Sequence, residues 1–131
     1  MHTNRQSNTP QKIHLHSASQ QLEVVFADEC FLLSAEYLRV FSPSAEVQGH
    51  GPGQQVLQFG KLNVAVNSLA AQGNYAIKII FNDGHDSGIY TWNYLYELGK
   101  FHAENWREYE QKLSAAGKSR DPNESAVRFL G

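Results

Sequence analysis

The sequence predicts an α+β fold in which helices cover a mostly antiparallel sheet. Short runs with apolar residues at every second position fill most of the first ninety residues, and from Thr91 the apolar period changes to about 3.6. We therefore expect a short helix near residues 34–41 and a long C-terminal helix near residues 91–116 packed on the sheet. A chain of 131 residues is long enough for one such domain.

The expected strands come in pairs joined by short polar turns. Alternating apolar residues and β-branched side chains favour extended structure in each of them. Residues 12–16 and 21–26 are expected to form a first hairpin. Residues 55–59 and 62–66 are two further possible strands, and residues 73–90 form the last hairpin.

The last hairpin is the most informative part of the chain because its turn carries a histidine between two carboxylates. Asn82, Asp83 and Gly84 supply residues that tolerate positive φ where the chain reverses. The turn then presents His85 and Asp86 at a fixed place.

Helix boundaries follow from residues that favour caps and stops. Ser34 is a suitable N-cap for the short helix, and Pro43 prevents its continuation. Thr91 is a suitable N-cap for the long helix and Gly117 a suitable stop, which is why we expect one uninterrupted helix between them.

The organisation along the chain is simple. We expect a disordered leader at residues 1–10, a single domain at residues 11–117 and a flexible tail at residues 118–131. Three glycines in residues 49–53 predict a mobile loop. Cys30 stands in an apolar run, so a buried, inert thiol is expected.

Composition and charge exclude several classes of partner. The formal charge is −2, and the 11 lysines and arginines are scattered, which argues against nucleic-acid binding. No run of about eighteen apolar residues predicts a membrane span, and the leader lacks the apolar core of a secretory signal. The cytoplasm is the expected compartment, and the oligomeric state is left open.

The motifs of the common enzyme classes are missing from the sequence. It contains no phosphate-binding glycine loop, no dinucleotide fingerprint and no Gly-x-Ser-x-Gly elbow. His102 and Glu104 have the spacing of an oxygenase ligand pair, but two residues apart on a helix they point about 200° from each other. We therefore expect no enzymatic activity from this chain alone.

Four segments together resemble one known family: Tyr37-Leu38-Arg39, Ser42-Pro43-Ser44-Ala45-Glu46, Gly73-Asn74-Tyr75-Ala76 and the run from Asp83 to Trp92. They are similar to the γ-butyrobetaine hydroxylase-like N-terminal domains over about residues 10–120. The resemblance implies a small α+β domain that occurs alone in bacteria, attached to Mrp-type iron–sulfur carrier ATPases, or ahead of an oxygenase domain.

The resemblance also implies a metal position. In the hydroxylases such a domain binds a structural zinc through three cysteines and a histidine, and these ligands fall on Ser42, Ser44, Val47 and His85 of this sequence. Serine hydroxyls are neither deprotonated near pH 7 nor soft, and valine has no donor atom. No cofactor is therefore expected at this position.

Two alternatives involving histidines stay open. His85 would bind zinc or iron weakly by recruiting Glu46, His50 or Asp86, which makes the chain a metal-binding module. His14 and His16 share one face of a strand, which suits a metal ion, but we expect them to be incidental surface histidines.

A structural role for His85 is also open, in which its ring binds Asp83, Asp86 or Ser42 and ties the hairpin to the end of the short helix. The favoured interpretation is a non-enzymatic accessory domain that contacts a protein, by resemblance an Mrp-type ATPase of iron–sulfur cluster assembly. The alternative partner is a separately encoded 2-oxoglutarate oxygenase. The predicted contact surface consists of Arg39, Glu46, His85, Asp86, Tyr90 and Trp92.

Overall fold

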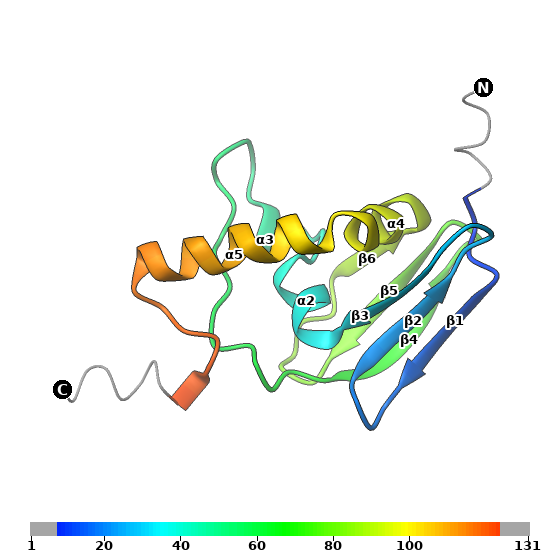
Figure 1. The fold of residues 1–131 in the computed structure, drawn as a ribbon, viewed down its shortest axis with the longest axis horizontal. Coiled ribbons are helices and arrows are strands. Elements are labelled where there is room, and N and C mark those ends of the chain that lie inside the picture. The colour runs from blue at the N-terminus through cyan, green and yellow to red at the C-terminus, as the bar shows by residue number, and fades with distance from the viewer. Residues whose placement is uncertain (1–7, 124–131) are drawn as a thin grey trace.

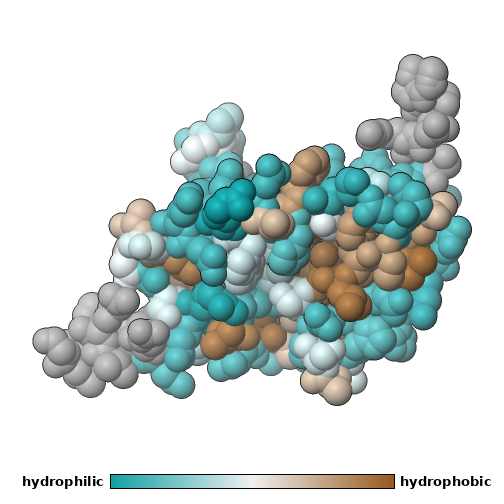
Figure 2. Space-filling view, viewed as in Figure 1, coloured by the Kyte–Doolittle hydropathy of each residue, from teal (hydrophilic) through white to brown (hydrophobic). Residues whose placement is uncertain are grey.

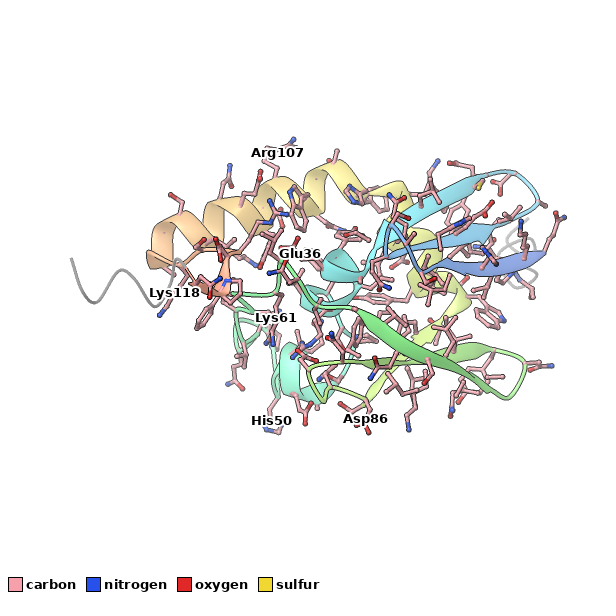
Figure 3. The ribbon with its side chains drawn as sticks, turned by 90° about the horizontal axis from the view of Figure 1, so that it is seen from below. Glu36, His50, Lys61, Asp86, Arg107 and Lys118 are labelled. Carbon is pink, nitrogen blue, oxygen red and sulfur yellow. The ribbon has the colours of Figure 1, made fainter. Side chains whose placement is uncertain are left out.

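The computed structural model describes residues 8–123, and it contains two three-stranded antiparallel sheets with helices at one end (Figure 1). The predicted α+β fold is therefore confirmed. Seen from below, the two sheets lie as separate layers (Figure 3). The strands are β1 (Lys12–His16), β2 (Gln21–Val25) and β3 (Cys30–Ser34) in one sheet, and β4 (Val66–Gln72), β5 (Ala76–Phe81) and β6 (Gly88–Thr91) in the other.

The first sheet buries one face and exposes the other, as the alternation in its strands requires. Leu22, Val24 and Leu33 point into the core, and register pairs such as Leu22 with Leu33 align them across the strands. Cys30 therefore lies on the opposite, outer face and is exposed. The prediction of a buried thiol was wrong because the apolar run alternates between two faces of a strand.

The second sheet contains the predicted hairpin. β5 and β6 pair antiparallel, with Ile77 opposite Tyr90. The predicted strands at residues 55–59 and 62–66 were wrong, since residues 35–65 contain no strand and β4 begins only at Val66. The amides of Gly60 and Leu62 instead donate to carbonyl oxygens of the C-terminal segment, at 2.9 and 3.0 Å.

The helices are α2 (Ala35–Val40), α3 (Ala45–Gln48), α4 (Trp92–Lys100) and α5 (His102–Ala116). Both predicted N-caps are confirmed: Ser34 accepts a hydrogen bond from the amide of Tyr37, and Thr91 from the amide of Tyr94. Gly117 ends α5 in the left-handed conformation, also as predicted.

The predicted single long helix is in fact two helices. Phe101, at φ −106° and ψ 26°, separates α4 from α5, and the two run in different directions (Figure 1). α4 contacts the sheets, because Gly99 lets it approach the ring of Phe31 closely. α5 turns away over α2, where Tyr109 and Leu113 pack with Val40 in a second apolar cluster.

The C-terminal segment is packed rather than free as far as it is described. Arg120 donates two hydrogen bonds to the carboxylate of Glu36, at 2.8 and 2.7 Å. Residues 118–123 of the predicted flexible tail are therefore docked on α2, while residues 124–131 and residues 1–7 of the predicted leader lie outside the described residues. None of the helices described combines the length and apolar composition that a membrane span needs.

Candidate functional site

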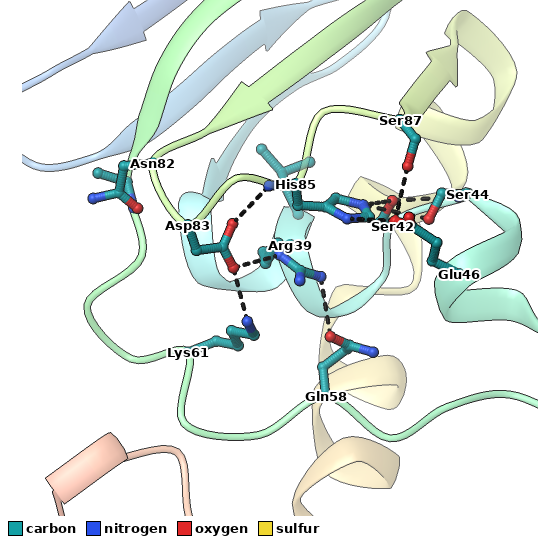
Figure 4. Close-up of polar contacts among 12 residues, drawn as sticks. Arg39, Ser42, Ser44, Glu46, Gln58, Lys61, Asn82, Asp83, His85 and Ser87 are labelled. Atoms are coloured by element: carbon teal, nitrogen blue, oxygen red, sulfur yellow. Dashed lines mark hydrogen bonds and ion pairs between the residues drawn. The ribbon is translucent and has the colours of Figure 1, made fainter.

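The turn between β5 and β6 lies at the centre of a polar cluster, which we call the hub (Figure 4). The turn itself closes through a hydrogen bond from the amide of Phe81 to the carbonyl of His85, and Gly84 supplies the positive φ of 91°. The side chains of the hub come from α2, α3, their connection, the segment 55–65 and the turn: Arg39, Ser42, Ser44, Glu46, Gln58, Lys61, Asp83, His85 and Ser87.

His85 is buried and has polar partners on both sides of its ring. Its Nε2 lies 2.9 Å from Ser42 Oγ and 3.3 Å from Ser44 Oγ, and its Nδ1 lies 3.1 Å from Glu46 Oε1. Burial lowers the pKa of His85, and the nearby charge of Arg39 lowers it further. The ring is therefore neutral near pH 7, with Nδ1–H donating to the carboxylate of Glu46 and Nε2 accepting from Ser42. The predicted tie between His85 and Ser42 is confirmed.

Asp83 is the second centre of the hub. Its Oδ2 accepts hydrogen bonds from Arg39 Nε at 2.9 Å and from Lys61 Nζ at 2.7 Å, and its Oδ1 accepts from the amide of His85 at 3.2 Å. Burial alone would raise the pKa of Asp83, but these donors outweigh it and lower the pKa to about 2. Arg39 also donates to Gln58 Oε1. One carboxylate thus joins α2, the segment 55–65 and the turn.

The structure divides the predicted contact surface. Arg39 and His85 are buried in the hub, whereas Glu46 and Asp86 are exposed beside it. Tyr90 is fully buried and donates to the carbonyl of Leu38, so its assignment to a contact surface was wrong. Trp92 follows the far end of β6, where its Nε1 donates to the carbonyl of Asn74.

The residues at the implied zinc position do converge, but their chemistry does not fit the metal. Ser42, Ser44 and His85 are in contact, and Val47 is buried on α3. Two neutral hydroxyls and an apolar side chain cannot replace three thiolates. The hydroxyls instead satisfy the imidazole by hydrogen bonds.

The alternative set for zinc or iron does not assemble around His85. Only Glu46 contacts the ring, while His50 and Asp86 point outward from the lower rim in Figure 3. Within residues 8–123, no three histidine, cysteine or carboxylate side chains already converge on one point. The residues described therefore contain no preformed set of ligands for weak metal binding at His85.

Ser42, His85 and Glu46 are connected like the nucleophile, base and acid of a catalytic triad. Their burial is the opposite of what such a triad needs, since the nucleophile is buried and the acid is exposed. Ser42 is fully buried, and a Cβ atom on Gly88 would lie only 2.7 Å from its hydroxyl oxygen. The acid, in contrast, is the exposed member, with 70% of the Glu46 side chain accessible. Ser42 is thus closed off from solvent, and the three side chains link the turn to α3 and the residues before it.

Sequence reasoning missed several hub residues. Asp83 was assigned to the turn and considered as a partner of the His85 ring, but its ion pairs with Arg39 and Lys61 were not predicted. Gln58 was placed in a predicted strand and Lys61 in the turn after it, and neither position indicated a contact with the hub.

Taken together, the fold and the hub define a small α+β domain with a cluster of polar side chains around the turn between β5 and β6. A model of the family described as γ-butyrobetaine hydroxylase-like, N-terminal, matches residues 13–96. The chain belongs to this family, as its motifs predicted.

Solved structures agree with the family assignment. One structure determined by NMR in solution is 51% identical to this chain, with a TM-score of 0.78, and the match covers 88% of this chain and 91% of that one. A second NMR structure is 44% identical, with a TM-score of 0.76, and the match covers 88% of this chain and 87% of that one. A crystal structure of a protein of unknown function from Acidithiobacillus ferrooxidans, of the DUF971 family, is 36% identical over 70% of this chain and 92% of its own, with a TM-score of 0.59. No curated protein matches the chain.

Proposed function

We propose that this chain is a non-enzymatic accessory domain of the cytoplasm that binds a protein partner through the surface beside the hub. The observation that carries the proposal is the segment 55–65. Val56, Phe59 and Leu62 on this segment are 52%, 41% and 41% exposed. Between them, the side chains of Gln58 and Lys61 point inward to the hub and hold the segment in place.

This arrangement suits protein recognition. Large apolar side chains in the open favour association, and a backbone that is already fixed loses little entropy on binding. Figure 2 shows hydrophobic side chains gathered below α5, where this segment runs. A groove of about 540 Å³ opens beside Val56, and apolar side chains of α2, α3 and α5 line it, among them Val47 and Tyr109.

The polar surroundings fit the rim of such an interface. Glu46 and Asp86 are exposed near the turn and give the rim an acidic side. Ser87 donates to Glu46 at 3.0 Å, which holds this carboxylate in a defined position. The partner we propose, on the family resemblance, is an Mrp-type ATPase of iron–sulfur cluster assembly.

Titration of the isotope-labelled chain with the purified ATPase, followed by NMR and calorimetry, tests the proposal. We expect shifts at residues 55–62, and at least about tenfold weaker binding by the Val56→Ser/Phe59→Ser variant, since buried anchors carry most of an interface's energy. The matched control is Tyr75→Ser/Phe101→Ser, which removes two rings elsewhere on the surface that are 55% and 52% exposed.

Equal losses in the two variants, or no binding at micromolar concentration, would contradict the proposal. Binding instead to a purified 2-oxoglutarate oxygenase, with the same loss on substitution of Val56 and Phe59, would keep the surface and replace the partner.

A further inference from the structure

The strand β4 forms an edge of the second sheet that pairs with no further strand among residues 8–123. It pairs with β5 on one side only. A free edge presents unpaired backbone amides and carbonyls, and proteins protect such edges with short strands, charged residues or a covering helix. Whether an edge is open to a partner therefore depends on this protection.

The other edge strands of the two sheets each have one of these protections, and β4 has few. β1 carries Lys12 and two histidines, α4 packs against β3, and β6 is four residues long and leads directly into α4. β4 is seven residues long and contains neither a charged residue nor a proline. Its bulge lies between Val66 and Ser68, which leaves the stretch from Ser68 to Gln72 regular and open to pairing.

The pattern of hydrogen bonds shows which backbone groups of β4 point outward. In an antiparallel pair, every second residue directs its amide and carbonyl to the neighbouring strand, and the residues between direct theirs away from it. The amide of Asn82, just beyond β5, donates to the carbonyl of Ala65, so the even-numbered residues of β5 face β4. Their partners in the register are Ser68, Ala70 and Gln72. Leu69 and Ala71 therefore direct their amides and carbonyls to the free edge.

The strand is anchored on its inner face while this edge stays accessible. The side chain of Leu69 is partly buried and packs against the main apolar core. Ser68 and Ala71 are exposed. A partner strand thus meets a backbone that the core already holds in an extended conformation, which reduces the entropy lost on pairing.

We propose that β4 is a self-association edge, at which two copies of this chain pair their β4 strands antiparallel about a twofold axis through Ala70. In this register Leu69 lies opposite Ala71 of the second copy, and the symmetry repeats the pair on the other side of the axis. Both residues direct their backbone groups outward, so each pair exchanges an amide and a carbonyl in both directions. The two sheets then continue into one another across the axis.

The neighbouring registers use this edge less well. An axis through Leu69 places Ala71 opposite Asn67, which lies in the bulge. An axis through Ala71 places Leu69 opposite Gly73, which has left the strand with a φ of 55°. Only the axis through Ala70 pairs the regular outward-facing residues with each other.

The side chains in this register favour a second copy as the occupant. Ala70 meets itself at the axis, where the strands approach most closely, and an alanine leaves room for that approach. Ser68 lies opposite Gln72, so no charges of the same sign face each other across the pair. Lys78 lies opposite Ala70 on β5, and three strand spacings of about 4.8 Å separate it from its symmetry mate by about 14 Å, beyond the screening length of about 10 Å in 0.1 M salt.

The test measures self-association of the full chain by sedimentation equilibrium and amide exchange by NMR. We expect a monomer–dimer equilibrium with a dissociation constant between about 10 μM and 1 mM, because one pair of strands buries less area than a stable dimer interface. Between about 20 μM and 1 mM protein, exchange of the Leu69 and Ala71 amides should slow with concentration. The Ala70 amide, which faces β5, should be protected throughout.

Ala71→Pro removes an outward amide without removing a hydrogen bond to β5, and it should weaken association at least about tenfold, since symmetry removes the bond twice. The matched control is Ile89→Pro on β6. Ile89 also directs its amide away from β5, since the residues on either side of it face β5 in the register, and this variant should associate like the wild type.

A wild-type chain that stays monomeric at about 1 mM overturns the proposal. Equal association of Ala71→Pro and the wild type overturns it too, as does exchange at Leu69 and Ala71 that is independent of concentration. Association that perturbs residues 55–62 and leaves β4 unchanged assigns the contact to another surface and also overturns it. The exchange measurement uses the wild type alone, so a variant that fails to fold leaves the test intact.

Discussion

The substitution Asp83→Asn removes the carboxylate that joins three segments of the hub. The pKa of this group falls from 3.8 to about 2 in the folded protein. At about 1.36 kcal/mol per pKa unit, this corresponds to about 2.4 kcal/mol. A quarter of the side chain is exposed, so solvent screening reduces the expected contribution to about 1–2 kcal/mol.

The pH dependence has a definite sign. Because folding lowers the pKa of Asp83, its contribution is complete above the unfolded value of 3.8 and is lost as the pH falls from there through about 2. Urea unfolding of the wild type and of Asp83→Asn should therefore differ by about 1–2 kcal/mol at pH 7, and by about half as much at pH 3.

The neighbouring substitution Asp86→Asn is the matched control, because Asp86 lies on the same turn and is exposed. It should change the free energy of unfolding by less than about 0.5 kcal/mol. A constant difference between wild type and Asp83→Asn from pH 7 to pH 3 would refute the role given to this carboxylate. An equal effect of the two substitutions would refute it as well.

Three further predictions concern His85, Gly99 and Arg120. Burial lowers the pKa of His85, so wild-type stability should decline as the pH falls below about 6.5, whereas His85→Gln should show a flatter urea profile between pH 7.5 and 5.5. In Gly99→Ala the new Cβ would lie 2.3–2.5 Å from the ring of Phe31, so calorimetry should show a loss of about 1–3 kcal/mol, partly recovered by adding Phe31→Leu. Arg120→Ala leaves the buried carboxylate of Glu36 unpaired and should lower the free energy of unfolding in urea by about 2 kcal/mol. This is less than for a fully buried pair, because the Arg120 side chain is 39% exposed. Adding Glu36→Gln should restore part of the loss.

Local signals in the sequence were sufficient for much of the fold. The alternation of apolar residues predicted β1, β2, β5 and β6, and the hydroxyls of Ser34 and Thr91 identified where two helices begin. These features depend on residues within a few positions of one another. Composition and spacing alone are therefore enough to predict these strands and the starts of these two helices.

Features that depend on distant contacts were not predictable in this way. The break at Phe101 has no Pro or Gly at the break itself, and it allows α4 to follow the sheets while α5 packs on Val40. The segment 55–65 has the apolar alternation of strands, but it pairs with the C-terminal segment through Gly60. In both cases tertiary packing overrides the local preference.

The candidate site shows the same division. The family motifs pointed to His85, Ser42 and Ser44, and the structure brings them together. The ion pairs of Asp83 join residues 44 and 22 positions away in the chain, and no local pattern marks such partners. The sequence thus located the turn without revealing what holds it.

The composition of the hub explains how this chain does without the cage that its family resemblance implies. A structural zinc site contributes about 10–16 kcal/mol to folding, whereas one hydrogen bond contributes only about 0.5–1.5 kcal/mol. No single contact of His85 or Asp83 therefore replaces a metal, but together they connect α2, α3, the segment 55–65 and the turn. The contacts of His85 with Ser42 and Ser44 are buried, so breaking one of them leaves an unsatisfied polar group behind. The contacts of Lys61 and Glu46 lie at the exposed edge of the hub and add to these. The segment 55–65 is thereby held rigid with its apolar side chains in the open, which is what a surface for protein recognition requires.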